Sequence, residues 1–243
     1  MNFYEKSICG NFRGINEDTV SIIKNNTDQT IALIADGMGG HEQGEVASQF
    51  VATKIKEKFE PTNYFKPEDG EKFVRDLIIQ TNRELYDYSS QNTSEKNMGT
   101  TLVLAAFFDE MIFIFNIGDS RAYGLKRYEI RQITNDHTFV NMLVDSGEIT
   151  KDEAKTHPQK NIVTKALGTN RLIQPDVFRL KNHLYNYILL TSDGVTDVLD
   201  DESIKTIVFE SDNKAEAVVK RAEELESKDN ISALVIDLKA GEV

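Results

Sequence analysis

The sequence predicts an α+β fold: a four-layer α-β-β-α sandwich in which two antiparallel sheets pack face to face and helices cover their outer faces. Short apolar runs dominate the chain, and many are joined by turns too short for a crossover, which favours antiparallel pairing. Only a few stretches show helical periodicity, and they do not alternate with the strands. That arrangement favours layered sheets and helices over a doubly wound parallel sheet.

The strands are expected where the apolar runs are bounded by turn residues. Asp109-Glu110, for example, separates two such runs and predicts a hairpin. By this criterion the strands lie near residues 3–9, 18–23, 30–35, 100–108, 111–118, 121–125, 128–133, 176–180, 186–191 and 231–238.

The helices are expected where apolar residues recur three or four positions apart. Such stripes run from Ala47 to Phe59, from Phe73 to Tyr88 and from Ala215 to Leu225. The polar segment at about 137–171 lies between strands and holds short helical pieces, so we expect it to form a flap outside the core. No linker-like tract interrupts the chain, which predicts a single domain over residues 1–243.

Composition restricts the partners. With 28 Lys and Arg against 40 Asp and Glu, the net charge of −12 argues against nucleic acid or an anionic membrane. The single cysteine, Cys9, cannot form an internal disulfide, and we find neither a signal peptide nor a run of the roughly 20 apolar residues that a membrane helix needs. We therefore expect a cytoplasmic protein, and an anionic ligand would require a local cation.

Four aspartates stand at the ends of predicted strands. Asp36, Asp119 and Asp193 each follow an apolar run and adjoin a glycine, and Asp229 comes just before the run that starts at Ile231. A single Asp-Gly pair is more often only a turn. In antiparallel sheets, however, the end of one strand lies beside the start of its neighbour, so these four carboxylates can meet at one rim.

A cluster of carboxylates requires cations. Two like charges ~4 Å apart repel by about 4 kcal/mol at an effective dielectric constant near 20. Oxygen ligands, without a Cys or His set at zinc spacing, suit Mg²⁺ or Mn²⁺. The carbonyl of Gly37, next to Asp36, would offer a further oxygen ligand for such an ion.

Two more segments contribute candidate residues. Arg13 offers a planar fork suited to phosphate oxygens, and Glu17 and Asp18 are acceptors for water bound to a metal, although the segment alone reads as an exposed charged turn. The glycine-rich loop at 36–45 matches neither a dinucleotide fingerprint nor a P-loop.

Together these runs resemble the PPM (type 2C) metal-dependent protein phosphatases, above all the bacterial single-domain members that are partnered with Ser/Thr kinases. The ordered motifs span nearly the whole chain. They are Arg13–Asp18, Ala35–Ser48, Met98–Thr101, Ile117–Tyr123, Thr134–Thr138, Ser192–Gly194 and Asp229–Ser232.

The resemblance implies a role for each candidate residue. Asp36 would bridge two Mn²⁺ or Mg²⁺ ions, the Gly37 carbonyl would bind the first, and Asp193 and Asp229 would bind the second. Asp119 with Asp193 would hold a third ion. Glu17 and Asp18 would hold water molecules that are bound to the metals, and Arg13 would bind the substrate phosphate.

The resemblance also implies roles for two histidines and one asparagine. The better-known eukaryotic members carry a histidine after the Asp-Gly pair as a proposed general acid, where this chain has Met38. His41 is the alternative acid, with a structural role at a helix start as the competing interpretation. His157 and Asn161 fall in the segment that matches the flap and would face substrate.

The implied activity is hydrolysis of phosphoserine and phosphothreonine in proteins by a water or hydroxide that bridges the two metals. We expect a monomer that acts on phosphoproteins and counteracts a bacterial Ser/Thr kinase. Two alternatives stay open: a phosphatase of small phosphate esters, and a catalytically silent regulatory binding module.

Overall fold

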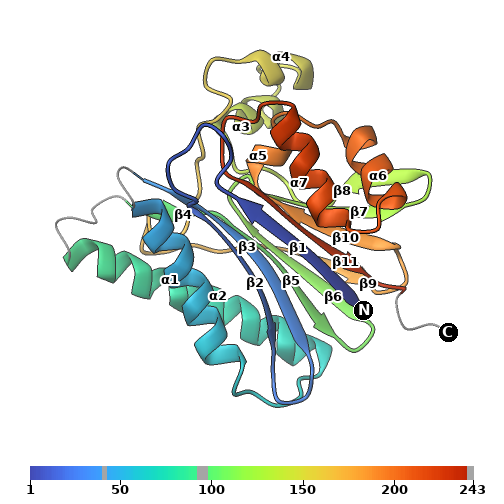
Figure 1. Cartoon of the computed structure of the whole chain (residues 1–243). Coiled ribbons are helices and arrows are strands. Elements are labelled where there is room, and N and C mark those ends of the chain that lie inside the picture. Colours follow the sequence, from blue (N-terminus) through green and yellow to red (C-terminus); the bar gives the residue numbers. More distant parts are fainter. Residues whose placement is uncertain (40–42, 92–97, 240–243) are drawn as a thin grey trace.

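The computed structural model describes residues 1–39, 43–91 and 98–239 of the 243-residue chain. Its strands form two antiparallel sheets that pack against each other (Figure 1). One sheet has the order β1 (Asn2–Ile8), β11 (Ile231–Asp237), β10 (Tyr187–Thr191), β7 (Arg121–Lys126) and β8 (Glu129–Gln132). The other has the order β2 (Asp18–Lys24), β3 (Thr30–Met38), β5 (Leu102–Phe108), β6 (Met111–Ile117) and β9 (Asp176–Lys181), with the short β4 (Gly99–Thr100) beside β3.

Helices cover both outer faces, as Figure 1 shows. The helices α1 (Gln43–Phe59) and α2 (Pro67–Gln91) lie against the β2–β9 sheet. On the other sheet lie α5 (Asp193–Thr196), α6 (Asp201–Glu210) and α7 (Lys214–Glu224). The excursion between β8 and β9 carries α3 (Phe139–Asp145) and α4 (Lys151–Thr156). The predicted four-layer α+β sandwich is confirmed.

The strand β5 shows how the apolar runs build the layers. Leu102 and Leu104 join the cluster under α1 and α2, whereas Val103 and Ala105 join the cluster between the two sheets. Both faces of the strand are buried, so the sequence reads as a continuous apolar run and the side chains alternate between two cores. A third cluster fills the space between the other sheet and α6 and α7.

Most predicted elements lie within a few residues of their observed bounds, and the hairpin at Asp109-Glu110 is present between β5 and β6. The predicted strand at 30–35 continues to Met38, because Gly37 pairs with Thr100 of β4. The predicted strand at 100–108 is interrupted at Thr101, which separates β4 from β5.

The helix α6 was not predicted. Only Ile204 and Val208 are buried on it, which is too short a stripe to stand out in the sequence. None of the helices in the described part of the chain combines the length and apolar character needed to cross a lipid bilayer.

Candidate active site

The predicted aspartates meet at one rim of the sandwich, where strands from both sheets begin or end. Asp18 of β2 lies directly opposite Asp36 of β3 in the strand register. Asp193 opens α5 after β10, Asp229 comes just before β11, and Asp119 lies in the turn between β6 and β7. The Asp36 carboxyl is within electrostatic reach of all four of the others.

Close backbone packing holds the segment around Asp36. The Gly37 N–H donates to the Glu17 carbonyl oxygen at 3.1 Å, and the Gly44 N–H donates to the Glu17 Oε1 at 3.2 Å. A Cβ on Gly37 would lie 2.0 Å from the Gly44 carbonyl oxygen, so only glycine fits here. Glu17 is thus fixed beside the rim, and its own N–H donates to Asn230 Oδ1 at 2.8 Å.

The carboxyl group of Asp18 is held by two serines. Its Oδ2 accepts hydrogen bonds from Ser192 Oγ at 2.8 Å and from Ser232 Oγ at 2.6 Å. Its Oδ1 is buried and has no hydrogen-bond partner among the described residues, and the same is true of Asp193 Oδ1. Buried polar atoms without a partner are rare in native proteins, so these two oxygens are candidate ligands for a cation.

The pKa values of the cluster are raised. Burial raises the pKa of Asp18 to about 6, against hydrogen bonds that lower it. Burial and the Asp136 carboxylate raise the pKa of Asp119 to about 6 as well. For Asp36 and Asp193, burial and the neighbouring carboxylates raise the pKa well above the usual range. The ionised cluster is unfavourable by itself, and a nearby cation would offset this cost.

The donor set fits a hard divalent cation. It offers carboxylate oxygens, two of them unpartnered, and the Gly37 carbonyl. Within the ranges that the structure describes, no three Asp, Glu, His or Cys side chains converge closely enough to hold one ion by themselves. Backbone carbonyls and water would therefore complete the coordination, which is the way proteins usually hold Mg²⁺ and Mn²⁺.

Arg13 lies at the edge of this cluster. Its Nη2 donates to Asp229 Oδ2 at 2.6 Å, and its Nε donates to the Lys228 carbonyl oxygen at 3.3 Å. The side chain is 46% exposed, so an incoming anion can reach the guanidinium. An arginine at this place supplies the local positive charge that a chain with a net charge of −12 otherwise lacks.

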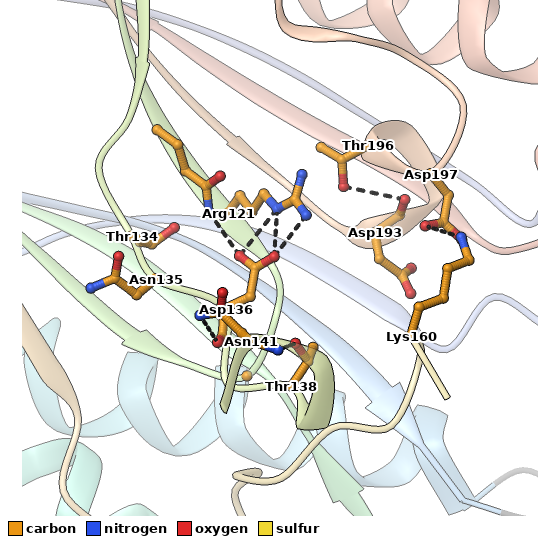
Figure 2. A network of polar contacts seen from close by, with 12 residues as sticks. Arg121, Thr134, Asn135, Asp136, Thr138, Asn141, Lys160, Asp193, Thr196 and Asp197 are labelled. Atoms are coloured by element: carbon orange, nitrogen blue, oxygen red, sulfur yellow. Dashed lines mark hydrogen bonds and ion pairs between the residues drawn. The ribbon is translucent and has the colours of Figure 1, made fainter. Parts of the chain in front are cut away.

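A cavity of about 1000 Å³ opens beside the carboxylates, between the excursion and α5–α6. Asp119 and Asp193 line it, together with Asn161 of the excursion. Lys160 and Asp197 form an ion pair at 3.2 Å that joins the excursion to the end of α5 (Figure 2).

Of the two predicted histidines, His157 stands apart from this arrangement. His157 is not among the described residues that line the cavity. Its Nδ1 accepts a hydrogen bond from the Gln159 N–H at 3.1 Å, and its ring packs on Phe139 at a centroid distance of 6.3 Å. These contacts give His157 a role within the excursion. His41 lies outside the described residues.

Several residues that support the site were not singled out from the sequence. Thr101 Oγ1 accepts the Asp36 N–H at 3.1 Å and lies 2.6 Å from Ser120 Oγ, so one hydroxyl ties Asp36 to the segment that carries Asp119. Ser192 and Ser232 hold Asp18. Each lies inside a motif already quoted, but only the fold shows what its hydroxyl contacts.

A family model described as protein phosphatase 2C matches residues 14–233 of the chain. The chain belongs to the protein phosphatase 2C family. Protein phosphatase 2C enzymes depend on metal ions in general, which agrees with the oxygen donors gathered at the rim.

Relatives in the protein phosphatase 2C family cover almost the whole chain. The serine/threonine phosphatase stp of Listeria monocytogenes is 34% identical, over 94% of this chain and 92% of its own. The crystal structure of the serine/threonine phosphatase Stp1 from Staphylococcus aureus superposes with a TM-score of 0.93 and 40% identity, over 97% of this chain and 94% of that one. The phosphatase PstP/Ppp of Mycobacterium tuberculosis superposes with a TM-score of 0.85 and 30% identity, over 97% of each chain.

Proposed function

We propose that this chain is a metal-dependent protein phosphatase that hydrolyses phosphoserine and phosphothreonine in proteins. The observation that carries the proposal is the cluster of buried carboxyl groups beside the accessible guanidinium of Arg13. Two of these groups have an oxygen without a partner among the residues that the structure describes. The names of the relatives, serine/threonine phosphatases that match this chain nearly end to end, support the same activity.

The carboxylates are proposed to hold Mn²⁺ or Mg²⁺. Asp36 would be shared by two ions, with the Gly37 carbonyl on the first and Asp193 and Asp229 on the second. A third ion would lie between Asp119 and Asp193. Such ions lower the pKa of water and neutralise charge on phosphoryl oxygens.

The side chains around the ions would orient water and phosphate. Asp18, held by two serine hydroxyls, presents Oδ1 as a fixed acceptor, and Glu17 is fixed beside it by the Gly44 N–H. These acceptors would orient water for attack on phosphorus, in line with the leaving seryl or threonyl oxygen. Arg13, held by Asp229, would bind the equatorial phosphoryl oxygens through its free N–H groups.

We also propose a domain organisation and a set of partners for the protein. Residues 1–243 would form one catalytic domain, with the excursion at about 137–171 as a flap over the site. The protein would act as a cytoplasmic monomer on phosphoproteins, opposite a cognate Ser/Thr kinase. The cavity beside Asp119 and Asp193 offers room for residues that flank the phosphorylated side chain.

The decisive experiment is hydrolysis of a phosphothreonine peptide by the purified chain with Mn²⁺, with Mg²⁺, and with excess chelator. We expect phosphate release with either metal and none with chelator. The Asp36→Asn variant serves as the matched control, because it keeps the side-chain size and removes the charge. A parallel series with p-nitrophenyl phosphate tests the alternative: turnover of the small ester without turnover of any phosphopeptide would refute a protein substrate.

A further inference from the structure

The turn that carries Asp119 is bound to the first residue of the flap. His137 Nδ1 accepts a hydrogen bond from the Gly118 N–H at 3.0 Å, and the His137 N–H donates to the Gly118 carbonyl oxygen at 3.0 Å. Both polar backbone groups of Gly118 therefore bond to His137, and the Gly118 carbonyl oxygen also accepts from Asn116 Nδ2 at 3.3 Å. Gly118 immediately precedes Asp119, so its backbone orientation sets where the Asp119 side chain points.

Gly118 occupies a conformation that leaves its N–H dependent on this partner. Its φ of +102° lies in the left-handed region, and a Cβ would lie 2.6 Å from Thr101 Cβ. The residue is buried, so an amide left without an acceptor would be strongly unfavourable. Without the imidazole, the turn would have to rearrange to satisfy that amide.

A second contact fixes the tautomer of His137. Its Nε2 lies 3.2 Å from Asp176 Oδ2, and the other oxygen of Asp176 accepts from Lys165 Nζ at 3.0 Å. Lys165 Nζ also lies 3.4 Å from Nε2. Because Nδ1 already accepts the Gly118 N–H, Nε2 carries the hydrogen and donates it to the Asp176 carboxylate. Burial and the Lys165 ammonium also lower the pKa of His137, which keeps the ring neutral.

We propose that His137 is a positioning residue: through the Gly118 N–H it fixes the turn that aims Asp119 at Asp193, and so sets how tightly a divalent cation binds between these carboxylates. The inference rests on the proposed function, because it gives Asp119 a role in metal binding. His137 touches neither substrate nor metal in this account. Its imidazole acts only through the backbone of its neighbour.

The side chain can be tested apart from the backbone of the flap. The flap is closed at its base by the Phe139 N–H to the Ile162 carbonyl oxygen and by the Thr164 N–H to the His137 carbonyl oxygen, both at 2.8 Å. These bonds remain whatever side chain stands at position 137. A change in Asp119 that follows the side chain therefore cannot be assigned to loss of the flap closure.

Two substitutions separate the two nitrogens of the ring. In His137→Asn the amide oxygen reaches the place of Nδ1 and can still accept the Gly118 N–H, while the contact with Asp176 is lost. In His137→Gln the longer amide reaches the place of Nε2 and keeps Asp176, while Gly118 loses its acceptor. His183→Gln, in the exposed turn between β9 and β10, controls for loss of a histidine elsewhere.

The readouts are hydrogen exchange at the Gly118 amide by NMR, Mn²⁺ binding by calorimetry, and kcat and KM for p-nitrophenyl phosphate. For His137→Gln we expect about tenfold faster exchange at Gly118, about tenfold weaker binding of the last Mn²⁺ ion and about tenfold lower kcat, at a KM within about twofold of the wild-type value. His137→Asn should retain most of each property, and His183→Gln should match the wild type.

Equal effects of His137→Asn and His137→Gln on Gly118 exchange and on Mn²⁺ affinity would overturn the inference, as would unchanged exchange in His137→Gln. Circular dichroism melts show whether each variant is folded. Wild-type protein that fails to hydrolyse p-nitrophenyl phosphate with Mn²⁺ would instead refute the proposed function. In that case the exchange and calorimetric data still decide whether His137 orders the Asp119 turn.

Discussion

The substitution Asp18→Asn is expected to stabilise the metal-free protein at alkaline pH. Asp18 is buried, lies opposite Asp36, and has one carboxyl oxygen without a partner in the described part of the chain. Burial raises its pKa from 3.8 to about 6. An asparagine keeps the size of the side chain, can still accept from Ser192 and Ser232, and does not ionise.

The sign and the size of the stability difference between the Asp18→Asn variant and the wild type follow from the pKa of Asp18. A carboxyl group whose pKa is higher in the folded protein favours folding below pH 3.8, and this contribution is lost as the pH rises through about 6. The difference between the two pKa values corresponds to about 3 kcal/mol at about 1.36 kcal/mol per pH unit. At pH 8 the metal-free variant should therefore exceed the wild type by up to about 3 kcal/mol, or about 6–12 °C in Tm for a chain of this length.

The assay is thermal unfolding of both proteins in chelator between pH 4 and pH 8, repeated with Mn²⁺. In chelator the two Tm values should converge toward pH 4, separate as the pH rises to about 6, and differ by a nearly constant amount above it. With Mn²⁺ the gap should narrow, because an ion that binds only the folded state stabilises the wild type more. Asp212→Asn, at an exposed position between α6 and α7, is the matched control. A metal-free variant less stable than the wild type at pH 8 would refute this reasoning.

Three further outcomes are expected. Asp193→Asn should lose at least about a hundredfold in kcat for p-nitrophenyl phosphate with an unchanged circular dichroism spectrum, and wild-type turnover in this variant would contradict the assignment. Arg13→Ala should lower kcat/KM for a phosphothreonine peptide by about 10–100-fold, because the guanidinium would neutralise charge in the transition state. A change in Tm without a change in kcat/KM would show that Arg13 only stabilises the fold. Lys160→Ala should change Tm by less than about 4 °C, because its ion pair with Asp197 is partly exposed and worth at most about 1 kcal/mol. It should lower turnover of phosphopeptides more than turnover of the small ester, and the reverse order would argue against a flap that faces the peptide.

The fold was predictable because its strands are buried on both faces. A run such as 102–108 is apolar throughout, so its position and length are visible without any knowledge of its neighbours. The helix α6 lacks such a signal. Its cap at Asp200, which accepts the Ser203 N–H at 2.8 Å, is a local feature that many turns share, and its buried stripe is only two residues long.

The candidate site was predictable to the extent that strand ends determine it. Antiparallel pairing places Asp18 against Asp36 once the strands are assigned. The supporting groups depend on a register that the sequence does not reveal. Ser232 reaches Asp18 from 214 positions away along the chain, and His137 reaches Gly118 only because the flap turns back onto the β6–β7 turn. A serine or histidine inside a motif carries no indication of which atom it contacts.

The same geometry explains how an acidic chain would bind phosphate. Burial and the neighbouring carboxylates raise the pKa values of Asp36 and Asp193. The raised pKa values show that the ionised carboxylates repel one another, and this repulsion is strongest when no cation is present. Backbone hydrogen bonds hold both groups in place, Asp36 through strand pairing in β3 and Asp193 through the first turn of α5, and these bonds do not depend on side-chain charge. Repulsion that the fold cannot relieve becomes binding energy for a divalent ion, and the bound ions would then present positive charge to an anionic substrate. The carboxylate repulsion that lowers the folding stability of the metal-free protein is thus the same repulsion that a bound ion relieves. For this reason the Asp18→Asn substitution should raise the stability of the metal-free protein and lower its affinity for the metal.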